Sequence, residues 1–363
     1  MRGIRYSKYR PNEKDIFDEL LKLFQELLMY SGGNVELTVK WLIELNNEYN
    51  ITTDDYDIKD FLSDLILKGY LTTNEEDGTI IPAAKMDIEL RKRALKEVFG
   101  NIKRSVKGQH NSNKIGRGDE FTDELRNFNF GDNLENIAYI DTIKNAQINH
   151  GIDGFVLGYE DLMVRDTILQ SNMATVLMID VSHSMILYGE DRITPAKKVA
   201  MALSEYILTR FPGDTLDLVA FGDTAWMIDL DQLPYLEVGP YHTNTLAALE
   251  LANNILRARK NLNKQIFMIT DGKPTCIWRG KRLYKNPMGL DPTIINRCFN
   301  MAVKLKKQEI PITTFMIAHD PYLVQFVERF SELNGGKAFY SNLNNLGEFV
   351  LKDYKRARKG RDR

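Results

Sequence analysis

An apolar segment that ends in a cluster of oxygen-bearing side chains is the feature that most constrains the fold of this chain. Residues 174–179 read ATVLMI, a run typical of a strand covered on both faces of a parallel sheet, and Asp180, Ser182 and Ser184 follow it. One carboxylate and two hydroxyls on a tight turn are low-charge oxygen ligands of the kind that suits Mg²⁺ or Mn²⁺. The segment therefore predicts a divalent metal site at the end of a buried strand.

Two later segments supply further oxygen ligands where such a site needs them. Thr243 lies in HTNTLAAL at the start of a predicted helix, and Asp271 follows the apolar run 265–270 in FMITDGKP. In an open α/β sheet, the junctions that follow parallel strands meet above the carboxyl ends of those strands. We therefore expect both residues to lie beside the three oxygen ligands that follow residue 179.

The rest of the C-terminal half alternates between strand and helix patterns. Further strands are predicted at 215–221, 225–230, 312–317 and 337–340, and helices at 194–209, 243–260, 292–307, 321–334 and 346–354. The turn that joins the strands 215–221 and 225–230 is too short for a crossover, so this pair is antiparallel and its second strand is an edge. The pattern predicts an α/β fold with a doubly wound, mostly parallel, Rossmann-like sheet and one antiparallel edge strand.

The three ligand segments, in this order and on these elements, resemble the metal-ion-dependent adhesion site (MIDAS) of von Willebrand factor A (VWA) domains. The resemblance implies that Asp180 binds the metal largely through water and that Ser182 and Ser184 coordinate it through their hydroxyls. It also implies that Thr243 supplies the second-loop ligand and that Asp271 acts through water or directly. Such an ion keeps net positive charge and an open position for a partner's carboxylate, which couples partner binding to the ion.

Other interpretations of these residues stay open. Asp180 and Ser182 are good N-cap types and could merely cap the following helix. Thr245 could replace Thr243 as a ligand, although the family spacing T-x-x-x-x-A-L fits Thr243. His183 could touch a partner or act as a pH-sensitive neighbour of the site, but a histidine that faces solvent or packs on the next loop is the favoured interpretation.

Aromatic and basic residues fall in predicted loops at the same end of the sheet, and such side chains suit a protein interface. The predicted partner contacts are His183, Tyr241, His242, Lys273, Trp278 and Arg279, and the same loops contain Tyr188, Glu190, Asp191 and Tyr235. Cys276 also lies near the site and is interpreted as a small buried residue, because nothing indicates a reactive thiol.

Residues 1–100 indicate a mainly helical module with a small hairpin. Helices are predicted at 15–30, at 35–49, after a cap at 53–55, and at 87–99, with hairpin strands at 69–73 and 79–81. Three helices followed by a hairpin is the order of a winged helix, whose DNA-binding version places the third helix in the major groove. Here residues 54–60 contain four acids that phosphate would repel. The favoured interpretation is a protein-interaction module, and the alternative is a module with a purely structural role.

The middle of the chain is less regular. Residues 101–118 are polar, basic and Gly-rich and predict a linker, whereas 119–172 are interpreted as an extension that packs on the metal-binding domain, with strands at 155–157 and 162–169. A run found upstream of the metal motif in a bacterial VWA-like family is similar to Gly118, Glu120, Phe121, Arg126, Gly131, Asp132 and Ile137. The chain departs from that family at Ala138 and Tyr139. Arg126 and Asp132 are expected to pair with each other or to cap the sheet edge. The predicted metal-binding domain spans 173–355, and a basic, disordered tail follows at 356–363.

Composition and missing motifs limit the function classes. The 363 residues suffice for two domains, and a formal net charge of −2 creates no global field that favours nucleic acid or anionic lipid. No apolar run is long enough to span a bilayer, and no signal peptide is expected. Two cysteines favour a reducing cytoplasm over a disulfide framework. The chain lacks a Walker A loop and zinc-ligand spacing, and its few converging carboxylates do not suit a two-metal phosphatase, so no enzymatic activity is predicted.

The resemblance implies a divalent-metal-dependent protein-binding adaptor. Intracellular bacterial VWA proteins of this general kind resemble the partners of AAA+ ATPases of the MoxR or magnesium-chelatase type. The predicted partner is therefore such an ATPase, which offers an Asp or Glu to the metal, and no small-molecule substrate is expected. A DNA-linked regulator that uses the hairpin module is the alternative, and a metal-dependent hydrolase or an extracellular adhesin is less favoured.

Overall fold

The computed structural model describes residues 13–53, 55–74, 78–99, 115–130, 132, 134–151, 156–168, 172–189, 191–271, 273–286, 290–317, 321–340 and 353–355. The chain divides into two compact units. The first comprises Met1–Lys103 and Met173–Lys352, and the second comprises Arg104–Asn172 and Asp353–Arg363. The N-terminal helices therefore belong to the same unit as the central sheet.

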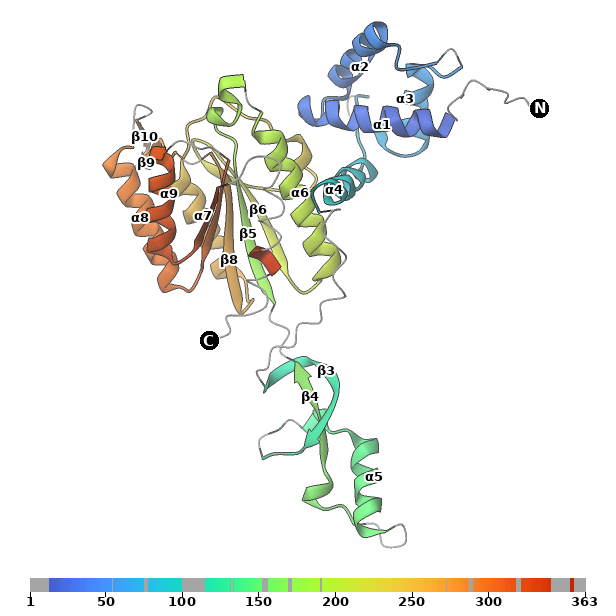
Figure 1. Cartoon of the computed structure of the whole chain (residues 1–363), viewed down its shortest axis with the longest axis vertical. Coiled ribbons are helices and arrows are strands. Elements are labelled where there is room, and N and C mark those ends of the chain that lie inside the picture. Colours follow the sequence, from blue (N-terminus) through green and yellow to red (C-terminus); the bar gives the residue numbers. More distant parts are fainter. Residues whose placement is uncertain are drawn as a thin grey trace, which may run out of the picture. The chain divides into compact units, whose positions relative to one another are not determined.

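Six strands form the central sheet of the first unit in the order β12-β11-β8-β5-β6-β7 (Figure 1). They are β5 (Met173–Asp180), β6 (Thr215–Phe221), β7 (Ala225–Ile228), β8 (Asn263–Thr270), β11 (Ile312–Met316) and β12 (Lys337–Tyr340). Neighbouring strands are parallel except for β6 and β7, which are antiparallel and leave β7 at an edge. This confirms the predicted α/β sheet with one antiparallel edge strand, although β7 ends at Ile228 rather than at residue 230.

Helices cover both faces of this sheet. One core cluster joins alternate residues of β5 and β8 to α7 (Thr245–Ala258), α8 (Pro292–Lys307) and α9 (Pro321–Asn334). The crossover from β5 to β6 through α6 (Ile193–Arg210) runs across the sheet in the opposite direction to the later crossovers. Right-handed connections therefore place α6 on the opposite face. Every residue of β5 is buried as a result, which explains its continuous apolar sequence.

The N-terminal part of the first unit has the predicted order of three helices, a hairpin and a fourth helix. The elements are α1 (Glu13–Tyr30), α2 (Val35–Tyr49), α3 (Ile58–Leu67), β1 (Leu71–Thr73), β2 (Ile80–Pro82) and α4 (Ala84–Phe99). The predicted cap of the third helix at 53–55 is wrong. Asp57 is the N-cap, because its carboxylate accepts the Asp60 N–H while the Asp60 carboxylate accepts the Asp57 N–H. The winged-helix assignment stays a prediction.

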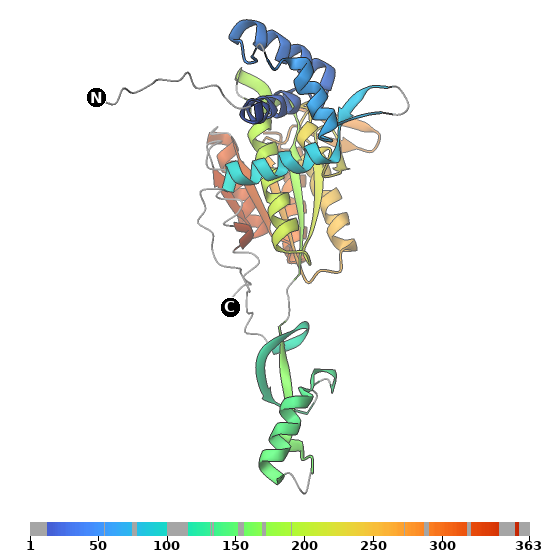
Figure 2. The same cartoon turned by 90° about the vertical axis from the view of Figure 1, so that its right-hand side faces the viewer.

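Helix α4 packs along the side of α6 that faces away from the sheet (Figure 2). Two ion pairs join these helices, Arg91 with Glu205 at 3.4 Å and Glu97 with Lys198 at 3.2 Å. The Arg91 and Glu205 side chains are largely buried, so this pair is shielded from solvent. Helix α6 therefore lies between the sheet and the N-terminal helices.

The second unit is built on an antiparallel pair, β3 (Ile115–Asn127) and β4 (Met163–Ile168), with one helix, α5 (Tyr139–His150). The predicted strand at 162–169 is confirmed as β4. The linker prediction is wrong for residues 115–118, which begin β3, and residues 156–157 form no strand. The rest of that predicted linker up to residue 114 and the predicted tail at 356–363 lie outside the described residues. Of the predicted helix 346–354, only 353–354 are described, and they are helical.

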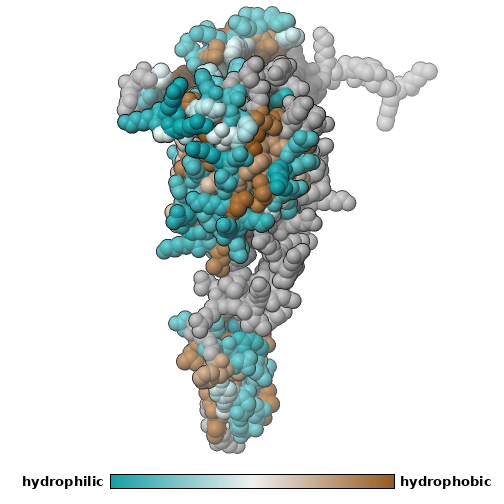
Figure 3. Space-filling model, turned by 90° about the vertical axis from the view of Figure 1, so that its left-hand side faces the viewer, coloured by the Kyte–Doolittle hydropathy of each residue, from teal (hydrophilic) through white to brown (hydrophobic). Residues whose placement is uncertain are grey.

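Helix α5 has a small buried face and a large exposed apolar surface. Only Thr142 and Ala146 are buried on it, whereas Tyr139, Ile140 and Ile148 are exposed. Figure 3 shows hydrophobic residues interspersed with hydrophilic ones on the surface of this unit. A buried face of two small side chains produces no apolar stripe at helical spacing, which is why the sequence pattern did not predict α5. Among the helices that the structure describes, none combines the length and apolar character needed to cross a membrane.

Candidate functional site

The three predicted ligand segments converge at the carboxyl end of the central sheet. Asp180 ends β5, Asp271 directly follows β8, and Thr243 lies two residues before α7. The first and second segments are joined where the His183 N–H donates to the Tyr241 carbonyl at 3.1 Å. The convergence follows from the parallel strand order, because β8 and β6 flank β5 on its two sides.

Asp180 is completely buried, and both of its carboxylate oxygens accept hydrogen bonds. The Ser182 N–H donates to Oδ1 at 2.9 Å, and the Thr270 hydroxyl donates to Oδ2 at 2.6 Å. Burial raises the pKa of Asp180, and the neighbouring charge of Asp271 raises it further. Sequence analysis missed Thr270, whose position as the last residue of β8 was the only available signal.

Asp271 is the second buried carboxylate of the cluster, and it has fewer hydrogen-bond donors around it than Asp180 has. Its Oδ2 lies 3.5 Å from Arg192 Nη1, a long contact, and its buried Oδ1 accepts no hydrogen bond from the described residues. Burial raises the pKa of Asp271, while a hydrogen bond from Ser184 and the Arg192 charge oppose that rise. An unsatisfied buried acceptor beside a second carboxylate is a position that a cation would fit. Arg192 was not predicted, because no motif marks it.

Hydroxyl groups complete the cluster. Ser182 is buried and Ser184 is half-buried, and their Oγ atoms lie 3.0 Å apart. Thr243 is buried, and its backbone is held on both sides, because its N–H donates to Thr275 Oγ1 and its carbonyl accepts the Thr275 N–H, both at 2.9 Å. The donor set of carboxylate and hydroxyl oxygens is the type that Mg²⁺ and Mn²⁺ prefer, so the residues present fit such an ion.

The first segment does not cap α6, because the Asp191 carboxylate accepts the Thr194 N–H at the start of that helix. Ser182 directly precedes a 3₁₀ helix, His183–Gly189, and its carbonyl accepts the Met185 N–H. The second segment also differs from its prediction. Helix α7 begins at Thr245 rather than at residue 243, because the Asn244 side chain caps it by accepting the Ala247 N–H.

Four of the predicted partner contacts, His183, Tyr241, His242 and Lys273, lie in the segments that carry the candidate ligands. His183 and Tyr241 are exposed, and the Tyr241 ring meets Trp226 edge to face with centroids 6.2 Å apart. His242 Nδ1 lies 3.2 Å from Asp223 Oδ1, and Lys273 is half-exposed just after β8. The Tyr188 side chain and Glu190 lie outside the described residues.

Trp278 and Arg279 are not in a loop, contrary to the prediction. They end strand β9 (Cys276–Arg279), which pairs antiparallel with β10 (Arg282–Lys285) in a separate two-stranded sheet. The short strands lie outside the main sheet and lack a clear alternation of buried and exposed residues, so their pattern was weak. Cys276 is buried as predicted, and burial raises the pKa of its thiol to about 12.

The N-terminal helices contact the segment that leads into Thr243. Lys197 of α6 is buried and donates to the carbonyls of Met29 at 2.9 Å and Leu236 at 3.0 Å. Burial lowers the pKa of Lys197 to about 8. The Tyr235 hydroxyl, predicted at the rim of the site, instead donates to Asp87 of α4 at 2.6 Å.

Two glycines allow this close approach. Gly32 and Gly33 follow α1 and adopt positive φ angles of 63° and 86°, which favour glycine. A Cβ on Gly32 would overlap the Glu237 side chain, and one on Gly33 would press against the Tyr235 ring. The turn after α1 therefore packs directly on residues 235–237, a few residues before the candidate ligand Thr243.

Comparison with known families gives a match over half of the chain. Residues 173–355 match a family model described as "Rv0959-like protein, vWA domain", and residues 120–167 match one described as "Rv0959-like protein, third domain". This chain belongs to the Rv0959-like family of VWA-domain proteins. Its VWA domain carries the candidate site, and its third domain contains α5 and β4.

Curated relatives include the uncharacterized proteins Rv0959 of Mycobacterium tuberculosis (strain ATCC 25618 / H37Rv) and Mb0984 of Mycobacterium bovis. Each is 28% identical over 309 residues, which cover 81% of this chain and 44% of the relative. The chain thus spans less than half the length of these relatives.

Solved structures with a similar fold include the PilB minor pilin from Streptococcus sanguinis. Its TM-score is 0.42 at 16% identity, and the match covers 56% of this chain and 66% of that chain. The vWF domain of the type V pili tip protein Mfa5 from Porphyromonas gingivalis has a TM-score of 0.44 at 14% identity, with 54% and 98% covered. The SpRpn10 VWA domain has a TM-score of 0.38 at 16% identity, with 50% and 95% covered.

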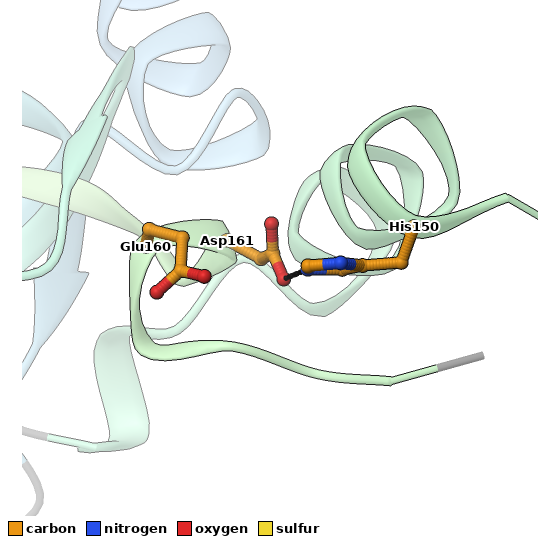
Figure 4. A group of neighbouring side chains, drawn as sticks. All are labelled: His150, Glu160 and Asp161. Atoms are coloured by element: carbon orange, nitrogen blue, oxygen red, sulfur yellow. Dashed lines mark hydrogen bonds and ion pairs between the residues drawn. The ribbon is translucent and has the colours of Figure 1, made fainter. Parts of the chain in front are cut away.

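The third domain contains a second group of potential metal ligands, which the sequence analysis did not single out. Ligand atoms of His150, Glu160 and Asp161 lie within 4.8 Å of one another. Figure 4 shows His150 hydrogen-bonded to Asp161, with Glu160 apart from that pair. Asp161 is buried and already accepts hydrogen bonds from Asn149 Nδ2, the Gly158 N–H and His150 Nε2. These donors satisfy the carboxylate, so the group joins α5 to the segment before β4 and needs no metal.

The predicted pairing of Arg126 with Asp132 is confirmed in the third domain. Arg126 Nη1 and Nη2 donate to the two carboxylate oxygens of Asp132 at 2.6 and 2.7 Å. This bidentate contact lowers the pKa of Asp132 to about 2. Both residues therefore hold the turn after β3.

Proposed function

We propose that the VWA domain binds Mg²⁺ or Mn²⁺ at the carboxyl ends of β5 and β8 and uses the ion to capture a carboxylate of a partner protein. The ligands would be Asp180, Ser182, Ser184, Thr243 and Asp271. The observation that carries the proposal is the buried Oδ1 of Asp271, which accepts no hydrogen bond from the described residues.

Electrostatics support this assignment. Two buried carboxylates lie close enough for the charge of Asp271 to raise the pKa of Asp180, and the nearest described cation, Arg192, stands 3.5 Å from Asp271. Buried charges of the same sign are costly unless a cation neutralises them. A bound divalent ion would neutralise them and, because the other ligands are uncharged hydroxyls, would keep positive charge for an incoming carboxylate.

The proposed role is that of an adaptor without enzymatic activity, in which a partner such as an AAA+ ATPase of the MoxR or magnesium-chelatase type supplies the acidic residue. The family resemblance of the ligand segments is what points to this class of partner. The alternative of a DNA-linked regulator is not favoured. The exposed acids Asp57 and Asp60 lie at the start of α3, the helix that would be the DNA-recognition helix, and DNA phosphates would repel them.

Calorimetric titration of the full chain with Mg²⁺ and Mn²⁺ tests the metal site. We expect one ion to bind the wild type and no binding to Asp180→Ala or Asp271→Ala. Asp231→Ala, which removes an exposed carboxylate elsewhere in the VWA domain, is the matched control and should bind as the wild type does. A wild type that binds neither ion, or variants that bind equally well, would contradict the proposal.

Affinity capture then tests the partner. A protein retained by the wild type in Mg²⁺, but released by EDTA and not retained by Asp180→Ala, would support capture through the ion. If EDTA and the Asp180→Ala substitution both leave retention unchanged, the partner binds at a surface other than the metal site.

A further inference from the structure

The β9–β10 hairpin concentrates positive charge beside the proposed metal site. Residues 273–286 include no acidic side chain and contain Lys273, Arg279, Lys281, Arg282 and Lys285. The strands pair from Cys276 with Lys285 to Arg279 with Arg282, and Gly280, with a φ of 60°, permits the tight turn between them. A cationic hairpin therefore directly follows the loop that carries Asp271.

Hydrogen bonds hold this hairpin against the second ligand segment. The N–H groups of Thr275 and Cys276 both donate to the Thr243 carbonyl, at 2.9 and 3.3 Å. Farther along β9, the Trp278 Nε1–H donates to the Asp223 carbonyl at 3.0 Å, and that carbonyl also accepts the Asn244 side chain at 3.0 Å. The hairpin thus has a defined position relative to the candidate ligand Thr243.

Three exposed aromatic side chains lie near these contacts, Trp226 in β7, Tyr241 in the loop before Thr243 and Trp278 in β9, and we name them the aromatic rim. Their exposed fractions are 36%, 38% and 39%, although large aromatic side chains are usually buried. Trp226 contacts Tyr241, and Tyr241 lies two residues before Thr243. Exposed aromatic residues beside clustered arginines are typical of protein-binding surfaces.

We propose that the hairpin and the aromatic rim select an acidic segment of a partner protein. In that segment the carboxylate that reaches the metal is flanked by further Asp or Glu residues and by an aromatic or aliphatic residue. The cations of the hairpin complement the acidic flank, and the aromatic rim receives the apolar residue. The inference rests on the proposed metal-dependent function and names the class of partner that this function serves.

A peptide suits this surface better than a nucleic acid. The carboxylate of Asp223 lies in the same loop that anchors Trp278, and it is partly exposed. A continuous phosphate backbone would meet this charge, whereas a peptide carries its acidic residues at separate positions. The whole chain also has a formal net charge of −2, which does not attract polyanions in general.

A peptide selection on the full chain tests the inference. Short peptides with one fixed Asp and random flanks are bound in Mg²⁺ and eluted with EDTA, and we expect the eluted sequences to be enriched in further acids and in aromatic or aliphatic residues. Selected peptides should bind the triple variant Arg279→Ser, Lys281→Ser, Arg282→Ser about tenfold more weakly, with the loss largest at low salt.

The matched control removes the same number of charges elsewhere. Lys304, Lys306 and Lys307 are exposed in the last turn of α8, and replacing all three by Ser should leave peptide binding unchanged. Peptides that require Mg²⁺ but show no flank preference, or that bind the hairpin variant as they bind the wild type, would overturn this inference and leave the metal function intact. EDTA-insensitive binding of an oligonucleotide to the hairpin would also overturn it. If no peptide requires Mg²⁺ and calorimetry detects no ion, the proposed function itself fails.

Discussion

Asp161 in the third domain and the pair Asp180 and Asp271 in the VWA domain are all buried, but their pKa values shift in opposite directions. In the third domain, Asp161 accepts hydrogen bonds from Asn149, Gly158 and His150, and these bonds lower its pKa. In the VWA domain, burial raises the pKa of both Asp180 and Asp271, and the charge of Asp271 raises the pKa of Asp180 further. Burial alone therefore does not mark a ligand site. The difference lies in how many donors the fold provides for each carboxylate, and the VWA pair is left short of positive charge.

Removing Asp161 should have the largest effect. Asp161→Ala leaves three donors without their acceptor, and we expect amide exchange in α5 and β4 to become at least roughly hundredfold faster. Hydrogen-exchange mass spectrometry of the full chain measures this. Glu160→Ala, which alters the neighbouring exposed carboxylate, should change exchange little. If both variants change amide exchange equally, Asp161 does not join α5 to the segment before β4. The structural role assigned to Asp161 in this comparison would then be wrong.

Tyr235→Phe tests how much a neutral hydrogen-bond donor, the Tyr235 hydroxyl, stabilises the buried carboxylate of Asp87. Asp87 is buried, burial raises its pKa, and the Tyr235 hydroxyl is its hydrogen-bond donor at 2.6 Å. Losing that donor should cost about 1–3 kcal/mol of the free energy of unfolding, measured by chemical denaturation. The control, Tyr284→Phe, removes a similar bond to Asp291, which keeps donors from Thr293 and Asn286.

The two tyrosine variants should therefore differ in the size of their effect. Tyr284→Phe should cost less than Tyr235→Phe, because Asp291 retains other hydrogen bonds. Equal losses would show that the number of remaining donors does not determine how costly a missing partner is.

Asp271→Asn should stabilise the metal-free protein, because the raised pKa of Asp271 means that the folded state disfavours the charged carboxyl at neutral pH. Thermal unfolding in EDTA should show a higher Tm for the variant, and added Mg²⁺ should raise the Tm of the wild type only. Asp161→Asn should destabilise under the same conditions. A lower Tm for Asp271→Asn in EDTA would mean that the fold already satisfies this carboxylate.

Arg126→Met should have the smallest effect, a change in the pH response of the third domain. The pKa of Asp132 is lowered from 3.8 to about 2, mainly by the hydrogen bonds from Arg126. The ionised pair therefore stabilises the domain fully above pH 3.8, and this contribution is lost as pH falls through about 2. A carboxyl NMR titration should show the pKa of Asp132 rising toward 3.8 in the variant, and an unchanged value would remove Arg126 as the cause.

Local sequence patterns predicted the elements that build the sheet and position the ligands. The apolar run before Asp180 becomes the buried strand β5, and the short turn after Phe221 forces the antiparallel edge. Both are short-range properties, because strand burial and turn length are written into adjacent residues. The same reasoning gave the pairing of Arg126 and Asp132, which are only six residues apart, as one of two expectations, and the structure shows that pair.

Long-range contacts escaped that analysis. Thr270 donates to Asp180 across 90 positions of the chain, and Arg192 approaches Asp271 across 79. The β9–β10 hairpin was also missed, although its strands are local, because it pairs outside the main sheet and its burial pattern does not alternate. Sequence spacing did not show that Thr270 and Arg192, from distant segments, would meet the two carboxylates.

By itself the sequence determined the α/β alternation and the order of the candidate oxygen ligands, since each depends on neighbouring residues. Only the tertiary structure decided which carboxylate oxygens accept hydrogen bonds. It also decided that the N-terminal helices contact the loop before Thr243, through Lys197 and Tyr235. The physical reason is that a hydrogen bond or a desolvated charge depends on the three-dimensional surroundings of a group. Those surroundings come from segments far apart in the chain.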